Sequence, residues 1–393
     1  MANLEPLIQS IPVAPLKLAS LEGCRTLADQ VNNYLVSFRH ESPTNVGQAD
    51  SLQGYCADSY LLECECPRFG SGEGKGVLKE SVRGCDLFIM VDVTNYSLTY
   101  RVNGYENHMS PDNHYQDLKR IISAADGKAR RINVIMPFLY EGRQHKRSKR
   151  ESLDCALMLQ ELVDMGVSNI LTFDAHDPRV SNSIPLHGFD SFMPTYQFLK
   201  ALVNSVPDFV IDNDHLMIIS PDEGAMGRAV YFSNILGVDM GMFYKRRDYS
   251  TVVNGKNPIV AHEFLGDDVK GKDVIIIDDM ISSGESIIEV ATELKRRKAN
   301  RIFAAATFGL FTNGLEKFDK AYEEGVLTGV LTTNLIYQTP ELLSKPYYIN
   351  CDMSKYIALI IDTLNHDGSL SQILSPNERI QNVLRKYKNG EKI

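Results

Sequence analysis

The sequence predicts an α/β fold in two similar domains, each a mostly parallel sheet flanked by helices. Three observations support this prediction. Short apolar, β-branched runs alternate with segments of helical spacing from residue 85 onward, which is the pattern of a parallel sheet covered by helices. The chain has 393 residues, a length that favours more than one domain at about 150 residues per domain. Acidic residues follow a buried strand in two places, Asp174–Asp177 and Asp278–Asp279, as expected if the two domains have similar folds.

Seven apolar runs have the length and composition of strands that are buried on both faces. They are Leu87–Val91, Ile132–Met136, Asn169–Phe173, Leu216–Ser220, Met240–Tyr244, Val274–Ile277 and Arg301–Ala306. Apolar residues at helical spacing predict crossover helices over 151–166 and 286–297. The polar stretches 41–66 and 101–130 interrupt this order, and we expect insertions or surface loops there. We expect the last twenty residues to form a polar helical tail.

This order of elements predicts the domain boundaries. An N-terminal domain spans residues 1–190 and a second domain spans residues 191–345. A C-terminal helical segment over 346–393 is expected to pack back on the N-terminal domain.

Composition and charge exclude several classes of protein. Hydrophobic residues make up 44% and charged residues 23% of the chain, as in packed globular proteins. The net charge of −9 argues against general binding to nucleic acid or to an anionic membrane, and we expect neither as a partner. No run approaches the roughly 20 apolar residues of a spanning helix, and the N-terminus lacks a basic region followed by an apolar one, so the expected location is the cytoplasm. The seven scattered cysteines contain no C-x-x-C pair, which predicts reduced thiols.

The strongest local pattern lies in residues 272–286. An apolar strand runs into Asp278 and Asp279, then into a loop of small residues, 282–286, and then into a helix. Ligands of open α/β sheets bind at this edge, and the amides of a loop and a helix N-terminus favour an anion. We therefore predict a phosphate on the loop and sugar hydroxyls on the two acids. The alternative is a plain capped helix with Ser282 or Ser283 as its N-cap.

Two basic segments stand out in this acidic chain. Five basic residues fall within the eight positions Arg143–Arg150, which suits a polyphosphate; a basic surface turn or an RNA-binding patch is the alternative. The second segment begins at Tyr244–Asp248 and continues as a polar, strand-poor stretch to about His262. A mobile loop with cations can close over a phosphoryl group, and an exposed hairpin is the alternative.

Two further predicted strands are followed by polar residues that are candidates for a binding or metal site. His176 lies between Asp174 and Asp177 after one strand, where an imidazole can ligate a metal or contact phosphate. A purely structural histidine is the alternative. Asp222 follows the strand Leu216–Ser220, and we expect it to face the same crevice.

Taken together and in this order, these segments resemble ribose-phosphate pyrophosphokinases, also called phosphoribosyl pyrophosphate synthetases. The resemblance extends from about Phe69 to about Leu374. It rests on Phe69–Glu73 (F-x-D-G-E in the family), Glu80–Asp86 (E-S-V-R-G-x-D), Met136–Arg150 (M-P-Y-x-x-Y-x-R-Q-D-R-K), Asp174–His176 (D-L-H), Ser220–Asp222 (S-P-D), Lys245–Arg247 (K-R-R), Asp278–Ser286 (D-D-M-I-D-T-x-G-T) and Ser369–Ser371 (S-V-S). The chain departs from these patterns at Ser71, at His145 and within the loop 282–286.

The resemblance implies two tandem type I phosphoribosyltransferase-like domains. It implies an enzyme that transfers the β,γ-diphosphoryl group of ATP to the 1-hydroxyl of ribose 5-phosphate and releases AMP, with Mg²⁺ as cofactor. It also implies a homo-oligomer built from dimers, up to a hexamer. The implied residues are Lys245, Arg247 and His176 for catalysis; Ser71, Gly72, Glu73, Arg143, Gln144 and His145 for ATP; Asp278, Asp279, Ser282, Ser283, Gly284, Glu285 and Ser286 for ribose 5-phosphate; and His176, Asp222 and Asp174 for the metal.

Two other functions fit the same residues. A phosphoribosyltransferase needs the loop after Asp278 but not the basic segment Arg143–Arg150. A non-catalytic regulatory paralogue fits the altered residues of the 282–286 loop, and it predicts nucleotide binding without turnover.

Overall fold

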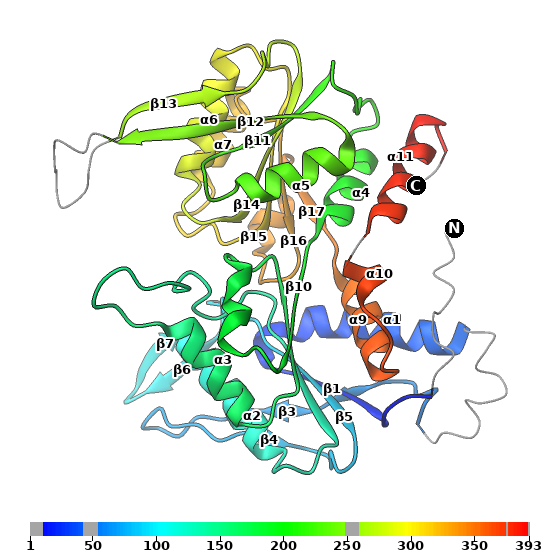
Figure 1. Cartoon of the computed structure of the whole chain (residues 1–393). Coiled ribbons are helices and arrows are strands. Elements are labelled where there is room, and N and C mark those ends of the chain that lie inside the picture. The colour runs from blue at the N-terminus through cyan, green and yellow to red at the C-terminus, as the bar shows by residue number, and fades with distance from the viewer. Residues whose placement is uncertain (1–10, 42–53, 248–258, 375, 392–393) are drawn as a thin grey trace. The chain divides into compact units, whose positions relative to one another are not determined.

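The computed structural model describes residues 11–41, 54–247, 259–374 and 376–391 (Figure 1). The side chains of residues 245–247, 259–262, 372 and 388 lie outside this description. Backbone contacts divide the chain into two compact units. Unit 1 comprises the residues up to Pro194 together with Asn334–Tyr337 and Asp352–Pro376, and unit 2 comprises Thr195–Thr333, Gln338–Cys351 and the residues from Asn377 onward.

Unit 1 is built on a six-stranded sheet in the order β10-β9-β8-β5-β1-β2, in which every neighbouring pair is parallel. Its strands are β1 (Leu16–Ser20), β2 (Leu61–Leu62), β5 (Asp86–Met90), β8 (Arg131–Ile135), β9 (Asn169–Phe173) and β10 (Gly188–Phe192). Its helices are α1 (Arg25–Glu41), α2 (Pro111–Ala124), α3 (Asp154–Asp164), α9 (Ser354–Asn365) and α10 (Ser371–Leu374), with short 3-10 turns at Glu22–Cys24 and Pro178–Ser183. Two antiparallel pairs complete it, β3 (Cys64–Glu65) with β4 (Val77–Leu78) and β6 (Thr99–Val102) with β7 (Tyr105–His108).

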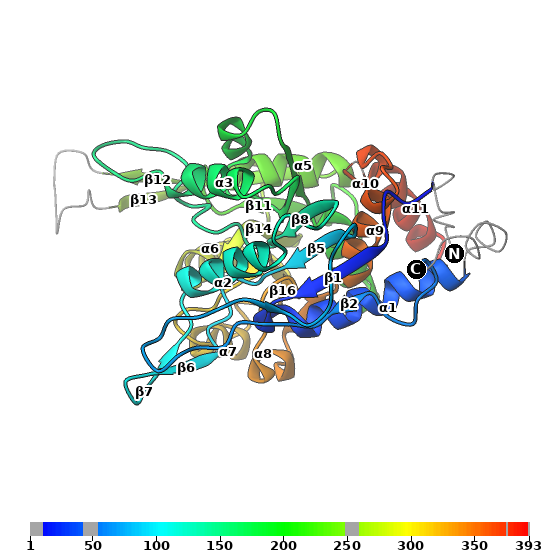
Figure 2. The same ribbon diagram turned by 90° about the horizontal axis from the view of Figure 1, so that it is seen from below.

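The sheet of unit 1 is covered on both faces. Successive residues of a strand point to opposite sides, and Leu87 and Ile89 of β5 join a buried cluster with apolar residues of α2 and α3. On the other face, the ring of Tyr356 in α9 lies 6.3 Å from Phe173 and 5.9 Å from Phe192. Helix α1 lies against α9 (Figures 1 and 2). Burial on both faces explains why these strands appear in the sequence as continuous apolar runs.

Unit 2 is built on a seven-stranded sheet in the order β13-β12-β11-β14-β15-β16-β17, in which only β13 is antiparallel to its neighbour. Its strands are β11 (Leu216–Ser220), β12 (Asp239–Arg247), β13 (Ile259–Leu265), β14 (Asp273–Ile281), β15 (Ile302–Gly309), β16 (Gly329–Thr333) and β17 (Tyr348–Cys351). Its helices are α4 (Thr195–Ser205), α5 (Met226–Leu236), α6 (Glu285–Arg296), α7 (Glu316–Glu323), α8 (Pro340–Ser344) and α11 (Asn377–Lys388).

The central strand β14 shows how unit 2 buries its sheet. Ile275 and Ile277 pack into a cluster with α4, α5 and α11, whereas Val274 and Ile276 pack into a second cluster with α6 and α7. The predicted polar tail is a helix, but it is not wholly solvated, because Ile380 of α11 is fully buried in the first cluster. Its Tyr387 hydroxyl also donates a 2.6 Å hydrogen bond to the carbonyl of residue 209.

All seven predicted strands and both predicted crossover helices are present, which confirms the α/β fold class. The prediction of a surface loop over 101–130 was wrong for α2. Ser110 accepts a hydrogen bond from the backbone N–H of Asn113, and the Asn113 side chain accepts one from the N–H of Ser110, which fixes the start of the helix. The residues of α2 that face the sheet then become part of the core.

The prediction of a strand-poor stretch to about His262 was also wrong. Strand β13 begins at Ile259 and pairs antiparallel with β12, so the two strands form the hairpin that was the alternative interpretation. Residues 248–258 of this stretch lie outside the described residues.

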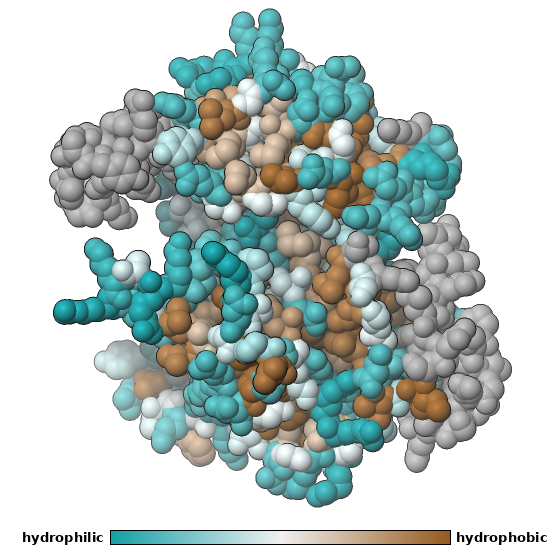
Figure 3. All heavy atoms as spheres, in the orientation of Figure 1, coloured by the Kyte–Doolittle hydropathy of each residue, from teal (hydrophilic) through white to brown (hydrophobic). Residues whose placement is uncertain are grey.

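None of the helices that the structure describes is long and apolar enough to cross a membrane. Hydrophilic residues cover much of the face seen in Figure 3.

Candidate active site

In unit 2, the acid pair Asp278–Asp279 lies within β14, beyond the end of the neighbouring strand β11. The register pairs Ile219 of β11 with Ile276 of β14, and β11 ends one residue later at Ser220. Strand β14 continues along β15 as far as Ile281. The two acids are therefore beside the segment that follows β11, which carries Asp222.

Three carboxyl groups gather at this edge of the sheet. Burial, together with the negative charges of Asp279 and Asp222, raises the pKa of Asp278 to about 8. Asp279 is itself buried, and its Oδ2 lies 3.7 Å from Nη2 of Arg228. Asp222 Oδ1 accepts hydrogen bonds of 2.9 and 3.2 Å from the backbone N–H groups of residues 224 and 225. Crowded acids of this kind favour a ligand that brings hydroxyl donors or a cation.

The loop that follows β14 leaves the start of α6 open. Gly284 is the N-cap residue, with φ +78°, and among the described residues no side chain caps the helix. The interpretation of Ser282 or Ser283 as the N-cap is therefore wrong. The side chain of Glu285 is held by Lys317 at 2.5 Å. Because the first N–H groups of a helix have no partner within it, this helix start suits a phosphate.

Gly284→Ala is expected to lower the free energy of unfolding of unit 2 by about 2–4 kcal/mol, from a left-handed backbone and overpacking together. A Cβ at this position would lie 2.3 Å from Cζ of the buried Phe318. Gly237→Ala is the matched control, because Gly237 has φ +68° but nothing lies within 4 Å of its Cβ position. Urea unfolding should show a loss of only about 1 kcal/mol for the control. Equal losses in the two variants would contradict the predicted clash with Phe318.

In unit 1, the structure brings together the segments that follow the neighbouring strands β8 and β9. Nε2 of His145 lies 3.4 Å from Oδ2 of Asp177, and the ring of His145 lies 5.3 Å from the ring of His176. His176 is exposed and Asp174 is buried. Two of the predicted segments, Arg143–Arg150 and Asp174–Asp177, therefore meet at one edge of the sheet.

Asp177 is a fixed anion in this cluster, a role that the sequence did not assign to it. Arg179 donates from Nη2 to Asp177 Oδ2 at 2.5 Å, and this pairing holds the pKa of Asp177 well below its usual range, with a further contribution from His145. Nδ1 of His145 is buried without a hydrogen-bond partner among the described residues. The other ring nitrogen faces the Asp177 carboxylate, so His145 presents an unused polar atom beside His176.

The remaining predicted ATP residues do not join this cluster. Ser71 Oγ donates to Glu73 Oε2 at 2.7 Å inside a tight turn, in which Gly72 has φ +92°. The turn instead contacts the β6–β7 hairpin, where the N–H of Asn103 donates to the carbonyl of residue 70. Within the described residues, no hydrogen bond or ion pair joins this turn to Arg143–His145. Arg143 is exposed, and Gln144 donates to the carbonyl of residue 152 at 2.8 Å.

The predicted catalytic cations and metal ligands are distributed over both units. The backbone of Lys245 and Arg247 belongs to β12, but their side chains lie outside the described residues. Asp174 and His176 belong to unit 1 and Asp222 to unit 2. In the described part of the chain, no group of three His, Cys, Asp or Glu side chains could hold a metal ion by itself.

Comparison with known proteins identifies the family. Residues 16–166 match the N-terminal domain of ribose phosphate pyrophosphokinase, and residues 199–344 match the phosphoribosyl transferase domain. The two matches occur in the order of the two units and together cover most of the chain. The chain belongs to the ribose-phosphate pyrophosphokinase family.

Relatives in this family of enzymes align over nearly their whole length. Ribose-phosphate pyrophosphokinase of Vibrio parahaemolyticus is 27% identical over 322 residues, which are 80% of this chain and 92% of the relative. The enzyme of Shewanella oneidensis is 28% identical over 315 residues, 78% of this chain and 89% of the relative. The crystal structure of phosphoribosylpyrophosphate synthetase from Mycobacterium smegmatis has a TM-score of 0.68 at 23% identity and covers 90% of this chain and 99% of its own. This structure confirms the tandem parallel-sheet fold.

Proposed function

We propose that the chain transfers the β,γ-diphosphoryl group of ATP to the 1-hydroxyl of ribose 5-phosphate, giving 5-phosphoribosyl 1-pyrophosphate and AMP. Its membership of the ribose-phosphate pyrophosphokinase family supports this activity. The observation that carries the proposal is the edge of the unit 2 sheet, where the acids Asp278 and Asp279 precede an uncapped helix start. A phosphate on the N–H groups of α6 leaves the sugar hydroxyls to donate to the two carboxyl groups.

The proposed reaction requires the protein to position the two substrates and to neutralise the charge of the transferring group. The 1-hydroxyl oxygen bonds to the β-phosphorus and releases its proton to water, the bond from that phosphorus to the α,β-bridging oxygen breaks, and AMP leaves with the electron pair. Little covalent chemistry falls to the protein, so holding the reactants in line dominates the rate. We assign Arg143, Gln144, His145 and the Ser71–Glu73 turn to ATP, and Lys245 and Arg247 to the transferring group.

The proposed residues fit Mg²⁺ as the cofactor. This ion keeps several waters and takes one or two protein ligands together with substrate phosphates, so it does not require a three-ligand protein cluster. Asp222 is partly accessible and His176 is exposed at their strand ends, and we propose that the protein ligands of the ion come from among these two residues and Asp174. When bound, Mg²⁺ would neutralise charge on the phosphates.

An AMP assay tests the proposal. Incubation of the full chain with ATP, Mg²⁺ and ribose 5-phosphate should yield AMP in equal amount to 5-phosphoribosyl 1-pyrophosphate. No AMP in several buffers would overturn the proposed activity. Nucleotide binding without turnover, with co-purification of a second synthetase chain, would identify the regulatory paralogue instead.

Lys245→Ala is expected to lower kcat by about 10³-fold, the magnitude lost when a cation on a transferring phosphoryl group is removed. Lys270→Ala is the control, because Lys270 is an exposed lysine of the same unit and should leave kcat unchanged. The comparison is made with the AMP assay at saturating substrates. A Lys245→Ala variant that keeps base-dependent pyrophosphate release would favour a phosphoribosyltransferase.

We also propose that the enzyme is a cytoplasmic homo-oligomer built from dimers. The family resemblance supports this assembly. Light scattering after size-exclusion chromatography measures the assembly directly, and a monomer with full turnover would contradict it.

A further inference from the structure

Unit 1 contains a cavity of about 320 Å³ that is separate from the residues assigned above. Its walls come from the start of α1, from β3 and the residues after it, from Leu98–Arg101, and from α2. Of the described residues that line it, none is assigned to ATP, ribose 5-phosphate or the metal. A ligand in this cavity would therefore be distinct from ATP, ribose 5-phosphate and the metal.

The carboxylates in the cavity wall are already bound by cations. Nη1 and Nη2 of Arg68 donate to the two carboxylate oxygens of Asp117 at 2.8 and 2.7 Å, and both side chains are nearly buried. Arg120 donates to the same carboxylate at 2.6 Å. Glu65 is bound by Lys79 at 2.6 Å. Asp117 and Glu65 therefore have little capacity left to neutralise the other arginines of the wall.

Two arginines of the cavity retain most of their donors. Arg25 makes one long hydrogen bond, from Nη2 to the carbonyl of residue 64 at 3.4 Å. Arg101 makes no hydrogen bond or ion pair within the described chain, and both guanidinium groups are exposed. Glu22 is the remaining acid of the wall. Three arginines and three acids line the cavity. Since Asp117 and Glu65 are already paired, Arg25 and Arg101 stand against Glu22 alone. In a chain whose overall charge is −9, this place is therefore locally attractive to an anion.

The other side of the cavity is apolar. Leu98, Tyr100 and Met109 are half-buried and line it, and the guanidinium of Arg68 lies 5.3 Å from the centroid of the Tyr100 ring. Burial raises the pKa of Cys64 to about 11 and that of Cys66 to about 12, so both thiols are neutral near pH 7. An apolar and aromatic surface therefore adjoins the unused guanidinium groups.

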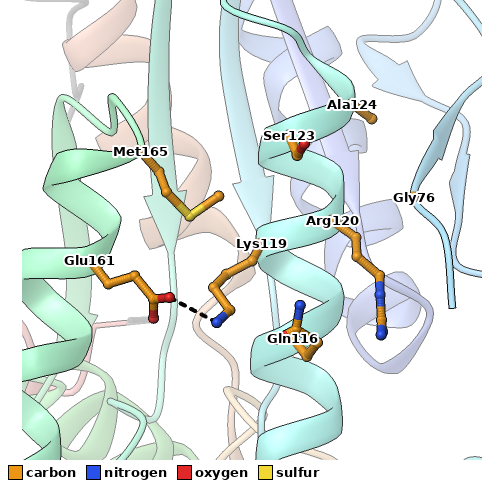
Figure 4. A pocket seen from close by; sticks show the side chains of 8 residues that line it. All are labelled: Gly76, Gln116, Lys119, Arg120, Ser123, Ala124, Glu161 and Met165. Carbon is orange, nitrogen blue, oxygen red and sulfur yellow. Dashed lines mark hydrogen bonds and ion pairs between the residues drawn. The ribbon is translucent and has the colours of Figure 1, made fainter. Parts of the chain in front are cut away.

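A second cavity of unit 1 differs from the first, because its charged side chains are paired with one another or with neighbours. It has a volume of about 440 Å³ and lies between α2 and α3. Figure 4 shows Lys119 and Glu161 extending toward each other across it, and Lys119 donates to Glu161 at 2.9 Å. Its other cation, Arg120, is bound to Asp117. Since its charges are matched by neighbours, this second cavity does not favour an anion.

We propose that the cavity beside α2 and the β6–β7 hairpin binds a small organic oxyanion, a carboxylate or phosphate on an apolar or aromatic body. The oxyanion binds to Arg25 and Arg101, because the planar guanidinium fork matches both groups. The body packs against Leu98, Tyr100 and Met109. Titration with phenyl phosphate and with phenylacetate distinguishes a phosphate ligand from a carboxylate ligand.

Isothermal titration calorimetry of the full chain with phenyl phosphate, phenylacetate and benzyl alcohol tests this proposal. We expect at least one of the anions to bind at millimolar concentration or tighter, and benzyl alcohol to bind at least about tenfold more weakly, because a charged hydrogen bond is lost. The tighter anion identifies the oxyanion class. The double variant Arg25→Gln/Arg101→Gln should bind the anion at least about tenfold more weakly.

Arg130→Gln is the matched control, since Arg130 is an exposed arginine of unit 1 outside the cavity, and it should bind as the wild type does. Circular dichroism checks the fold of each variant. If the double variant is misfolded, each single variant should still weaken binding by about threefold or more. The proposal is overturned if neither anion binds, if the folded double variant binds like the wild type, or if Arg130→Gln loses binding equally. Because the measurement is binding without turnover, its result is independent of the AMP assay.

Discussion

Asp278→Asn is expected to remove most turnover and, at the same time, to stabilise unit 2. The half-buried carboxyl group of Asp278 lies beside Asp279 and Asp222, and partial burial together with these charges raises its pKa. An amide of the same shape carries no charge, so it relieves the crowding of acids, and it can still accept the N–H of Asp279 that the carboxylate accepts at 2.8 Å. For ribose 5-phosphate, replacing one carboxyl oxygen by an amide NH₂ removes an acceptor for a sugar hydroxyl and should lower kcat/KM by at least about 100-fold.

The stability gained by this variant should depend on pH. In the unfolded chain an aspartate ionises near pH 4, whereas Asp278 in the folded chain ionises near pH 8. Between these values the folded state holds a proton that the unfolded state has lost, so the stability of the wild type falls as pH rises. The variant has no such loss. Its advantage should therefore grow from about pH 4 to about pH 8 and then stay constant, at about 2–4 kcal/mol.

Urea unfolding in EDTA at several pH values measures this difference, and the AMP assay measures the loss of turnover. Asp267→Asn serves as the control, because Asp267 is an exposed aspartate of the same unit and should change neither quantity. A variant that is less stable than the wild type at pH 8, or an advantage that shrinks as pH rises, would contradict the crowded-acid description of this edge.

The position of Asp278 illustrates what the sequence could and could not predict. The apolar run Val274–Ile277 predicted a buried strand, and the strand is there, but it continues through both acids to Ile281. It continues because β15 provides partners as far as Gly309. Pairing with a strand so far along the chain is a long-range property, so local composition located the acids near the edge without showing that they lie within the strand.

Helix α2 was missed for a different reason. Its apolar positions Tyr115, Leu118 and Ile121 have helical spacing, but polar residues stand between them, and His114 and Asp117 are themselves buried. These two polar residues are accommodated by partners elsewhere in the fold, since His114 hydrogen-bonds the carbonyl of residue 95 and Asp117 is bound by arginine. The sequence Ser110-Pro111 before that spacing is the signal that could have identified the helix start.

The pairing of His145 with Asp177 could not be predicted from spacing either. The sequence placed each residue after a strand, but their meeting depends on β8 and β9 being neighbours in the sheet, with Asn133 opposite Asn169. The departure from the family pattern did identify His145 as an unusual position. Its contact with Asp177 could be recognised only from the structure, in which the ends of β8 and β9 lie side by side.

Asp362→Ala is expected to lower the free energy of unfolding of unit 1 by about 3–5 kcal/mol, because it leaves a buried guanidinium without its counterion. Arg39 of α1 donates from Nε to Asp362 of α9 at 2.9 Å, and the side chains are 2% and 7% exposed. Arg39 also donates to Asn365 at 2.7 Å and lies 4.6 Å from the centroid of the Tyr55 ring. These contacts join a helix near the N-terminus of the chain to one that is more than 300 residues away.

Replacing both charges distinguishes the cost of an unpaired charge from the value of the pair. The double variant Arg39→Met/Asp362→Leu should recover much of the loss, since a buried ion pair and an apolar pair of similar volume often differ little in stability. Lys128→Ala is the surface control, because its ion pair with Asp126 is exposed and should be worth less than about 1 kcal/mol. Urea unfolding and hydrogen exchange of the α1 and α9 amides measure these effects. If the double variant is as unstable as the sum of its single variants, the helices depend on the specific contacts of Arg39 rather than on the neutralisation of its charge.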